Sequence, residues 1–222
     1  MLKKAIISAL LVLAVASAAW AQPARVEITG LFGYTFADGV SADPIKAANG
    51  ETYDRADPKD SAMFGLGIGF FVTPAAEVGF LWRRQATAIE LSGTTTTELG
   101  DTNIDGYHGY FAYYFGDPEG RTHPYILFGM GATHYEGVSY TKSGGAAATT
   151  AGATQFSSTV GAGVKVNAGK NFALKFGFQW TPTYIKSDAE GWWCDPYWGC
   201  WVVGDAQYSN QVELNGGIVI RF

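Results

Sequence analysis

Residues 172–180 read FALKFGFQW. Every second residue in this stretch, from Phe172 to Trp180, is large and apolar, whereas the residues between them include Lys175, Gly177 and Gln179. Successive side chains of a β-strand point to opposite faces of a sheet, so a repeat of two indicates a strand with one apolar and one polar face.

The same alternation returns in seven further stretches, which gives eight predicted strands. The others lie at 26–36, 64–70, 78–82, 107–115, 126–132, 156–166 and 208–222. Strands of soluble sandwiches usually have about 5–6 residues, whereas a tilted strand needs about 9–11 to cross a bilayer. Several of these runs reach roughly ten residues, which favours strands that cross a membrane.

Connection lengths provide an independent test. Long gaps at 37–60, 92–101, 139–154 and 186–206 alternate with shorter ones at 73–76, 116–123 and 167–171. Outer-membrane barrels have short periplasmic turns and longer outer loops, in this same alternation. The sequence therefore predicts an all-β fold, an eight-stranded antiparallel up-and-down transmembrane β-barrel whose first strand starts in the periplasm.

The N-terminus carries a separate signal. Lys3 and Lys4 precede an uncharged run and the small-residue site Ala19-Trp20-Ala21, the pattern of a secretory signal peptide. We expect residues 1–21 to be removed and residues 22–222 to form the barrel domain in the bacterial outer membrane. The chain has a net charge of −5, which argues against nucleic acid as a partner.

Short motifs add a family resemblance. The segments YYFG at 113–116, PY at 124–125 and GMG at 129–131, with the terminal Phe222, resemble the eight-stranded outer-membrane barrel superfamily that includes the OmpA transmembrane domain, OmpX and OmpW. This resemblance implies that the barrel-assembly machinery recognises the strand ending at Phe222. It also implies a monomer surrounded by outer-membrane lipid and lipopolysaccharide.

The inward phase of the predicted strands carries charged and aromatic polar residues, an expected lumen network. Its members are Arg25, Glu27, Glu77, Arg83, His108, Tyr110, Lys165, Lys175, Glu213 and Arg221. Both signs of charge are present, as burial requires. Counting residues from the turns places Arg83, Lys175 and Glu213 near mid-height, so Glu213 is expected to pair with one of the other two, Arg83 or Lys175. The network can act as a salt-bridge plug or as a gated ion path.

The outward phase carries aromatic residues that predict two girdles at the membrane surfaces. Phe70, Phe115, Phe172 and Phe222 fall at the periplasmic rim, and Tyr34, Phe36, Phe64, Trp180, Tyr184 and Tyr208 at the outer rim. Arg84 shares the outward phase with Trp82. Either Arg84 reaches lipopolysaccharide phosphates, or a bulge at Arg83 and Arg84 changes the phase.

The last outer loop, residues 186–206, holds the two cysteines of the chain. An exported protein meets an oxidising periplasm, so a disulfide between Cys194 and Cys200 is expected. It would hold a candidate surface-binding loop formed by Trp192, Trp193, Tyr197, Trp198 and Trp201. These rings either pack on other loops and headgroups or bind a sugar, lipid or protein. No second pair of ligands accompanies the cysteines, so no metal site and no cofactor are expected.

Three functions follow from these features. The main prediction is a structural or surface-interaction protein with a plugged lumen and a solvated acidic first outer loop. The alternative is an OmpW-like narrow channel or carrier for small or hydrophobic solutes, and the third is a lipid-modifying enzyme. The histidines His108, His123 and His134 lack a serine two residues later, the pattern of lipid A deacylase barrels, so we expect no catalysis.

Overall fold

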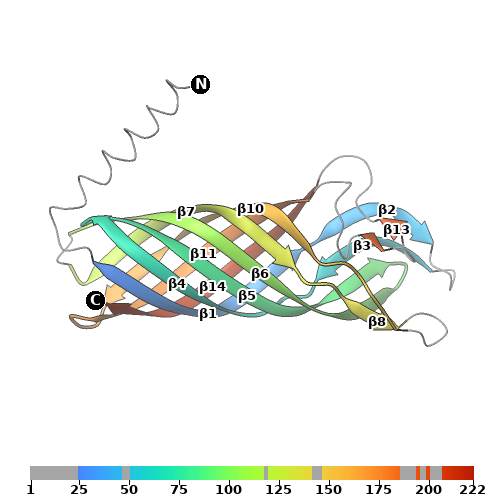
Figure 1. Cartoon of the computed structure of the whole chain (residues 1–222), viewed down its shortest axis with the longest axis horizontal. Helices are drawn as coiled ribbons and strands as arrows, with labels where there is room; N and C mark the ends of the chain where they lie inside the picture. The colour runs from blue at the N-terminus through green and yellow to red at the C-terminus, as the bar shows by residue number, and fades with distance from the viewer. Residues whose placement is uncertain are drawn as a thin grey trace, which may run out of the picture.

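The computed structural model describes residues 25–46, 51–117, 120–141, 147–185, 194–195, 199–200 and 207–222. Eight strands form a closed wall (Figure 1). They are β1 (Val26–Asp38), β4 (Ser61–Thr73), β5 (Ala76–Gly93), β6 (Thr96–Tyr114), β7 (Thr122–Tyr135), β10 (Ala153–Asn167), β11 (Phe172–Ile185) and β14 (Gln207–Arg221). The predicted eight strands and the predicted fold are confirmed. The expected signal peptide lies outside the described residues.

The strand order around the wall is β5-β4-β1-β14-β11-β10-β7-β6, and β6 pairs back with β5 to close the ring. All of these pairings are antiparallel. The first and last strands are neighbours, with Glu27 opposite Arg221. Strands four places apart, such as β5 and β11, therefore lie on opposite sides of the lumen.

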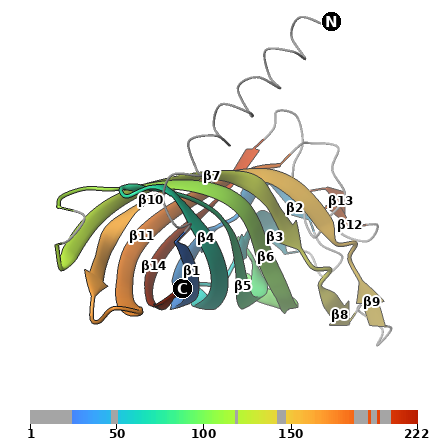
Figure 2. The same cartoon turned by 60° about the vertical axis from the view of Figure 1, so that its left-hand side comes forward.

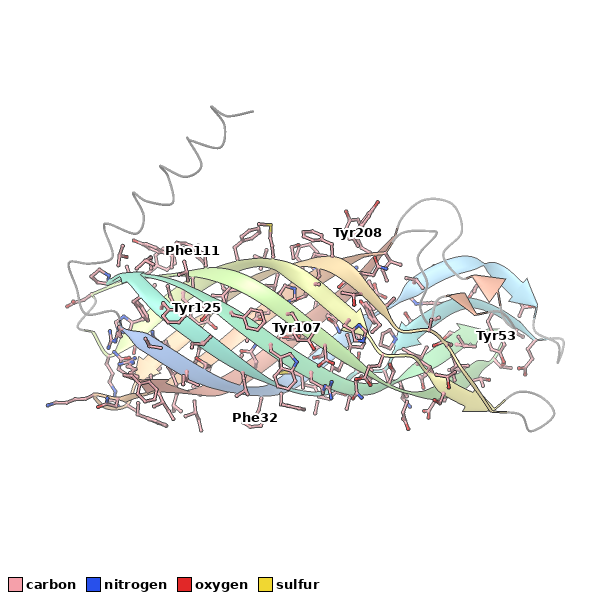
Figure 3. The ribbon with its side chains drawn as sticks, viewed as in Figure 1. Phe32, Tyr53, Tyr107, Phe111, Tyr125 and Tyr208 are labelled. Carbon is pink, nitrogen blue, oxygen red and sulfur yellow. The ribbon has the colours of Figure 1, made fainter. Side chains whose placement is uncertain are left out.

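Inward and outward positions alternate along every strand of the wall. Phe32, Phe111 and Tyr208 project from the outer surface (Figure 3), and Phe32 is 67% exposed. All the predicted girdle residues are exposed except Tyr184, which is half-buried. No described segment is a helix with the length and hydropathy to span a bilayer.

The two ends of the barrel differ. One end holds the C-terminus, and there β4 passes into β5 and β10 into β11 by short connections. The other end carries three additional strand pairs (Figure 1). They are β2 (Val40–Lys46) with β3 (Thr52–Pro58), β8 (Ser139–Thr141) with β9 (Ala147–Thr149), and β12 (Cys194–Asp195) with β13 (Gly199–Cys200). By the rule for outer-membrane barrels, the first is the periplasmic end and the second the outer end.

Two of the predicted outer loops extend the barrel wall as strands. The segment 37–60 contains the β2–β3 hairpin, and β3 pairs with β5, so the wall continues beyond the barrel. The segment 92–101 is mostly strand, because β5 runs to Gly93 and β6 starts at Thr96. Thr96 and Thr97 open β6, where β-branched side chains favour extended backbone, and Leu91 of β5 is buried.

The backbone at Arg84 is regular. Gly65 lies opposite Arg83 and Phe64 opposite Arg84 without interruption. The register shift between β5 and β6 comes later, between Ile89 and Glu90. The proposed bulge at Arg83 and Arg84 is therefore wrong, and the outward position of Arg84 needs another explanation.

Candidate functional site: the closed lumen

The layer of the lumen nearest the periplasmic end is an ionic cluster centred on Glu27 of β1. Lys165 of β10 places its Nζ 3.1 Å from Glu27 Oε2, and Arg221 of β14 places its Nε 3.0 Å from Oε1. Arg221 also donates to Asn167. All three charged side chains are at least nine-tenths buried. A buried carboxylate therefore has two cationic partners, and the cluster closes the periplasmic side of the lumen.

A second carboxylate lies beside this layer. Glu77 accepts hydrogen bonds from the hydroxyls of Tyr110 and Tyr114, and Lys175 Nζ donates to Tyr114 at 3.3 Å. Glycines make room for these groups, since a Cβ at Gly79 would lie 2.6 Å from the Tyr110 ring. The predicted lumen residues Glu77, Tyr110 and Lys175 thus lie together around Tyr114.

The middle layer is built on Arg83 of β5. Its Nη1 lies 2.5 Å from Glu213 Oε1, and its Nη2 donates to Thr181 at 3.1 Å. Because Thr181 belongs to β11, on the opposite side of the wall, this bond crosses the whole lumen. Of the two partners predicted for Glu213, Arg83 is the one that forms the ion pair in the structure.

The expected place of Lys175 is wrong. The register puts Lys175 directly opposite Lys165, so both belong to the periplasmic layer rather than to mid-height. Arg25 also departs from the prediction, because it is exposed. It precedes the first strand residue, and its guanidinium lies 5.6 Å from the centre of the Phe71 ring at the periplasmic rim. The other predicted lumen residues are buried.

Sequence reasoning missed a set of buried hydroxyls around His108. His108 Nε2 lies 2.9 Å from Ser157 Oγ, and Thr133 donates to the same serine oxygen at 2.9 Å. Thr183 donates in turn to Thr133. Small hydroxyl residues at inward positions were the available signal, but spacing along the chain does not show which strands meet. His108 and Ser157 are both fully buried, so a substrate cannot reach them in this structure.

The third layer is an apolar core at the outer end, which we call the outer core. Its buried members are Val40, Tyr53, Ala56, Ile89, Leu91, Ile104, Tyr135, Val138 and Ile185. Ile89 comes from β5 and Ile185 from β11, so the cluster spans the mouth of the barrel. Tyr53 lies at this end in Figure 3. Among the described residues, apolar side chains fill the mouth of the barrel.

Little space is left between these layers. One cavity in the lumen lies between Leu31, Tyr125, Gln179 and Asn215 and measures about 10 Å³. A volume of this size holds roughly one water molecule. This cavity is therefore too small for a solute larger than water.

The outward Arg84 is held by carboxylates at the outer rim. Its guanidinium donates to both oxygens of Asp105, at 2.8 and 2.6 Å, and lies 3.3 Å from Glu136. Trp82 Nε1 donates to Asp105 at 3.1 Å. Arg84 thus has protein partners beside the aromatic girdle, which explains its position without a bulge.

The first outer segment is organised by ion pairs. Arg55 of β3 contacts Asp38 and places its Nε 2.6 Å from Asp57 Oδ2. The hydrogen bond and charge of Asp57 raise the pKa of Arg55 above its ordinary value. Asp60 accepts from the Ala37 backbone N–H at 2.9 Å. In the described part of the chain, no three His, Cys, Asp or Glu residues are grouped to hold a metal ion.

The cysteines lie in the small β12–β13 pair. The register places Cys194 directly opposite Cys200, an arrangement compatible with the predicted disulfide, which stays a prediction. The aromatic residues of the candidate surface loop fall outside the described residues. These are Trp192, Trp193, Tyr197, Trp198 and Trp201.

Comparison with known proteins gives the family. The model of the outer membrane protein beta-barrel domain matches residues 6–222. The chain belongs to this family. Its place is the bacterial outer membrane, where lipid and lipopolysaccharide surround it. No curated protein matches the sequence.

Two solved structures share the fold of this chain. The outer membrane protein OprG from Pseudomonas aeruginosa is 15% identical with a TM-score of 0.58, over 90% of this chain and 97% of that one. Neisserial surface protein A is 12% identical with a TM-score of 0.50, over 90% and 100% of the two chains. At these identities the likeness concerns the fold alone.

Proposed function

We propose that this outer-membrane barrel is a closed structural protein that acts through its outer end rather than by passing solutes. One observation carries the proposal: three layers of side chains cross the lumen, at Glu27, at Arg83 and at the outer core. A channel or carrier needs a path through all three. The cavity beside Tyr125 and Gln179 measures about 10 Å³, which leaves room for roughly one water molecule.

Conductance in a planar bilayer tests the closed lumen. We expect no discrete openings from the refolded wild type, or from a variant with Arg83→Ser and Glu213→Ser, because the periplasmic layer and the outer core still block the path. A heat-dependent gel shift confirms that each protein is folded. Discrete openings of the wild type would contradict the closed lumen and favour the narrow-channel alternative.

The outer end is the proposed place of interaction. The β2–β3 hairpin and the extended parts of β5 and β6 project there beyond the short strands of the wall. In the proposal, the tryptophan-rich loop adds a contact surface for headgroups or a partner. Monomeric assembly through the strand ending at Phe222 belongs to the same proposal, and we assign no catalytic step.

The proposed disulfide has a direct test. Iodoacetamide added to the unreduced, denatured protein should leave Cys194 and Cys200 unmodified, and both should react after reduction. The added mass, measured on the intact chain, reports the number of labelled thiols. Two labelled thiols without reduction, in protein exported to the outer membrane, would show that the proposed loop has no such bond.

A further inference from the structure

The membrane-facing surface of the wall contains an apolar groove. It runs along β10, which lies between β7 and β11 (Figure 2). Outward residues Val160 and Ala162 form its floor, and the larger Ile126, Phe128, Phe178 and Trp180 form its walls. The groove has a volume of about 410 Å³, within the size range of small-molecule sites.

The groove is built by the register of the three strands. Val160 lies between Phe128 of β7 and Trp180 of β11, and Ala162 lies between Ile126 and Phe178. Two rows of bulky side chains therefore flank one row of small ones. Neighbouring strands are about 4.8 Å apart, so β7 and β11, which carry the two bulky rows, are roughly 10 Å apart. The groove is one strand wide and follows the strand direction.

The chemistry of the lining limits what can bind. Every lining residue is apolar or glycine, and the indole N–H of Trp180 already donates to Asn210 at 3.2 Å. A polar ligand would find no hydrogen-bond partner there. Within the hydrocarbon layer, attraction arises from close van der Waals packing rather than from the hydrophobic effect.

The width of the groove determines which apolar group can occupy it. A membrane helix is about 10–12 Å across with its side chains, so it cannot enter between the walls. A second barrel is broad and convex, and a specific interface needs roughly 800 Å² from each partner, far more than a furrow one strand wide provides. A single extended hydrocarbon chain fits, and the same face already borders the lipid of the membrane.

We propose that this groove binds one acyl chain of an outer-membrane lipid. The chain lies along β10, in contact with the aromatic walls, and it exchanges more slowly than the lipids around the rest of the barrel. Recognition is by the hydrocarbon chain and not by the headgroup. The site is independent of whether the lumen conducts.

Native mass spectrometry from nanodiscs tests this site. The probes are dimyristoylphosphatidylcholine and dimyristoylphosphatidylglycerol, which share their chains and differ in headgroup. Val160→Phe places a ring on the floor of the groove. Val78→Phe is the matched control, because it makes the same change at another outward position, and the two valines are 44% and 38% exposed.

We expect wild type and the Val78→Phe variant to retain one lipid of either kind, and the Val160→Phe variant to lose it. Equal retention by both variants would overturn the proposal, and so would retention of only one headgroup type. A heat-dependent gel shift checks that each variant is folded. If Val160→Phe does not fold, Ala162→Phe fills the same floor from the next outward position and is judged by the same outcomes.

Discussion

Strand β5 passes through two regions with opposite polarity. In the membrane-spanning part its inward side chains include Arg83 and its outward ones Trp82, whereas beyond the membrane Ile89 points inward and Glu90 is partly exposed. The repeat of two does not change along the strand. What changes is the surroundings, from hydrocarbon to water, and the sequence exchanges the polar and apolar faces accordingly.

The two interiors are therefore stabilised differently. The lumen consists of charged and hydroxyl groups that must satisfy one another, and removing one partner leaves another buried and unpaired. The outer core is an ordinary apolar cluster, in which a deletion costs contacts and leaves a cavity. Three substitutions test this difference.

Glu27→Ala should give the largest effect. It leaves Lys165 and Arg221 buried without their carboxylate, and breaking such a cluster costs about 4 kcal/mol. Urea titration of the protein in lipid vesicles measures the loss in the free energy of unfolding. The control is Glu98→Ala, the same change in an exposed ion pair. Equal stability of the two variants would mean that the periplasmic layer does not hold the barrel together.

Ile89→Ala should destabilise the outer end alone. Ile89 is fully buried in the outer core, and such a truncation costs roughly 3 kcal/mol. We expect faster hydrogen exchange in β3 and in the outer parts of β5 and β6, with unchanged protection near Glu27. Uniformly faster exchange along the whole barrel would show that the two interiors unfold as one unit.

Lys59→Met should give the smallest effect. Lys59 is exposed and lies 3.1 Å from Glu98 and 3.2 Å from Glu90. Hydrogen bonds to these carboxylates raise the pKa of Lys59 above its ordinary value of 10.5. Any stabilisation that these ion pairs provide is thus fully present below pH 10.5 and is lost only as the pH rises through the raised pKa of Lys59. Unfolding curves of wild type and variant should coincide from pH 6 to pH 9, and a difference there would give this surface pair a structural role.

The barrel wall could be predicted from sequence because one repeat defines it. The alternation around Phe176 or Phe111 locates each strand and its lipid-facing side without knowledge of its neighbours. The outer extension was harder to predict. Beyond Thr87 the inward phase changes from polar to apolar, at Ile89 and Leu91. The segment at 92–101 therefore looks like a loop when only the membrane pattern is sought.

Contacts inside the lumen were only partly predictable. The inward phase identified Glu27, Glu77, Arg83 and Glu213 as lumen residues, yet pairing depends on the stagger of the strands around the ring. For this reason the height of Lys175 was misjudged, and the bond between Arg83 and Thr181 was not foreseen. Hydroxyl residues such as Ser157 carry no charge or period that would set them apart.

The contacts of Glu27 also have a consequence for the order of assembly. Its partners Lys165 and Arg221 lie 138 and 194 residues further along the chain. Contacts of such long sequence separation form late, because a long loop must close first. A ring closed without the last strand would leave Glu27 without Arg221. The carboxylate of Glu27 therefore has both of its cationic partners only after the last strand has joined the ring.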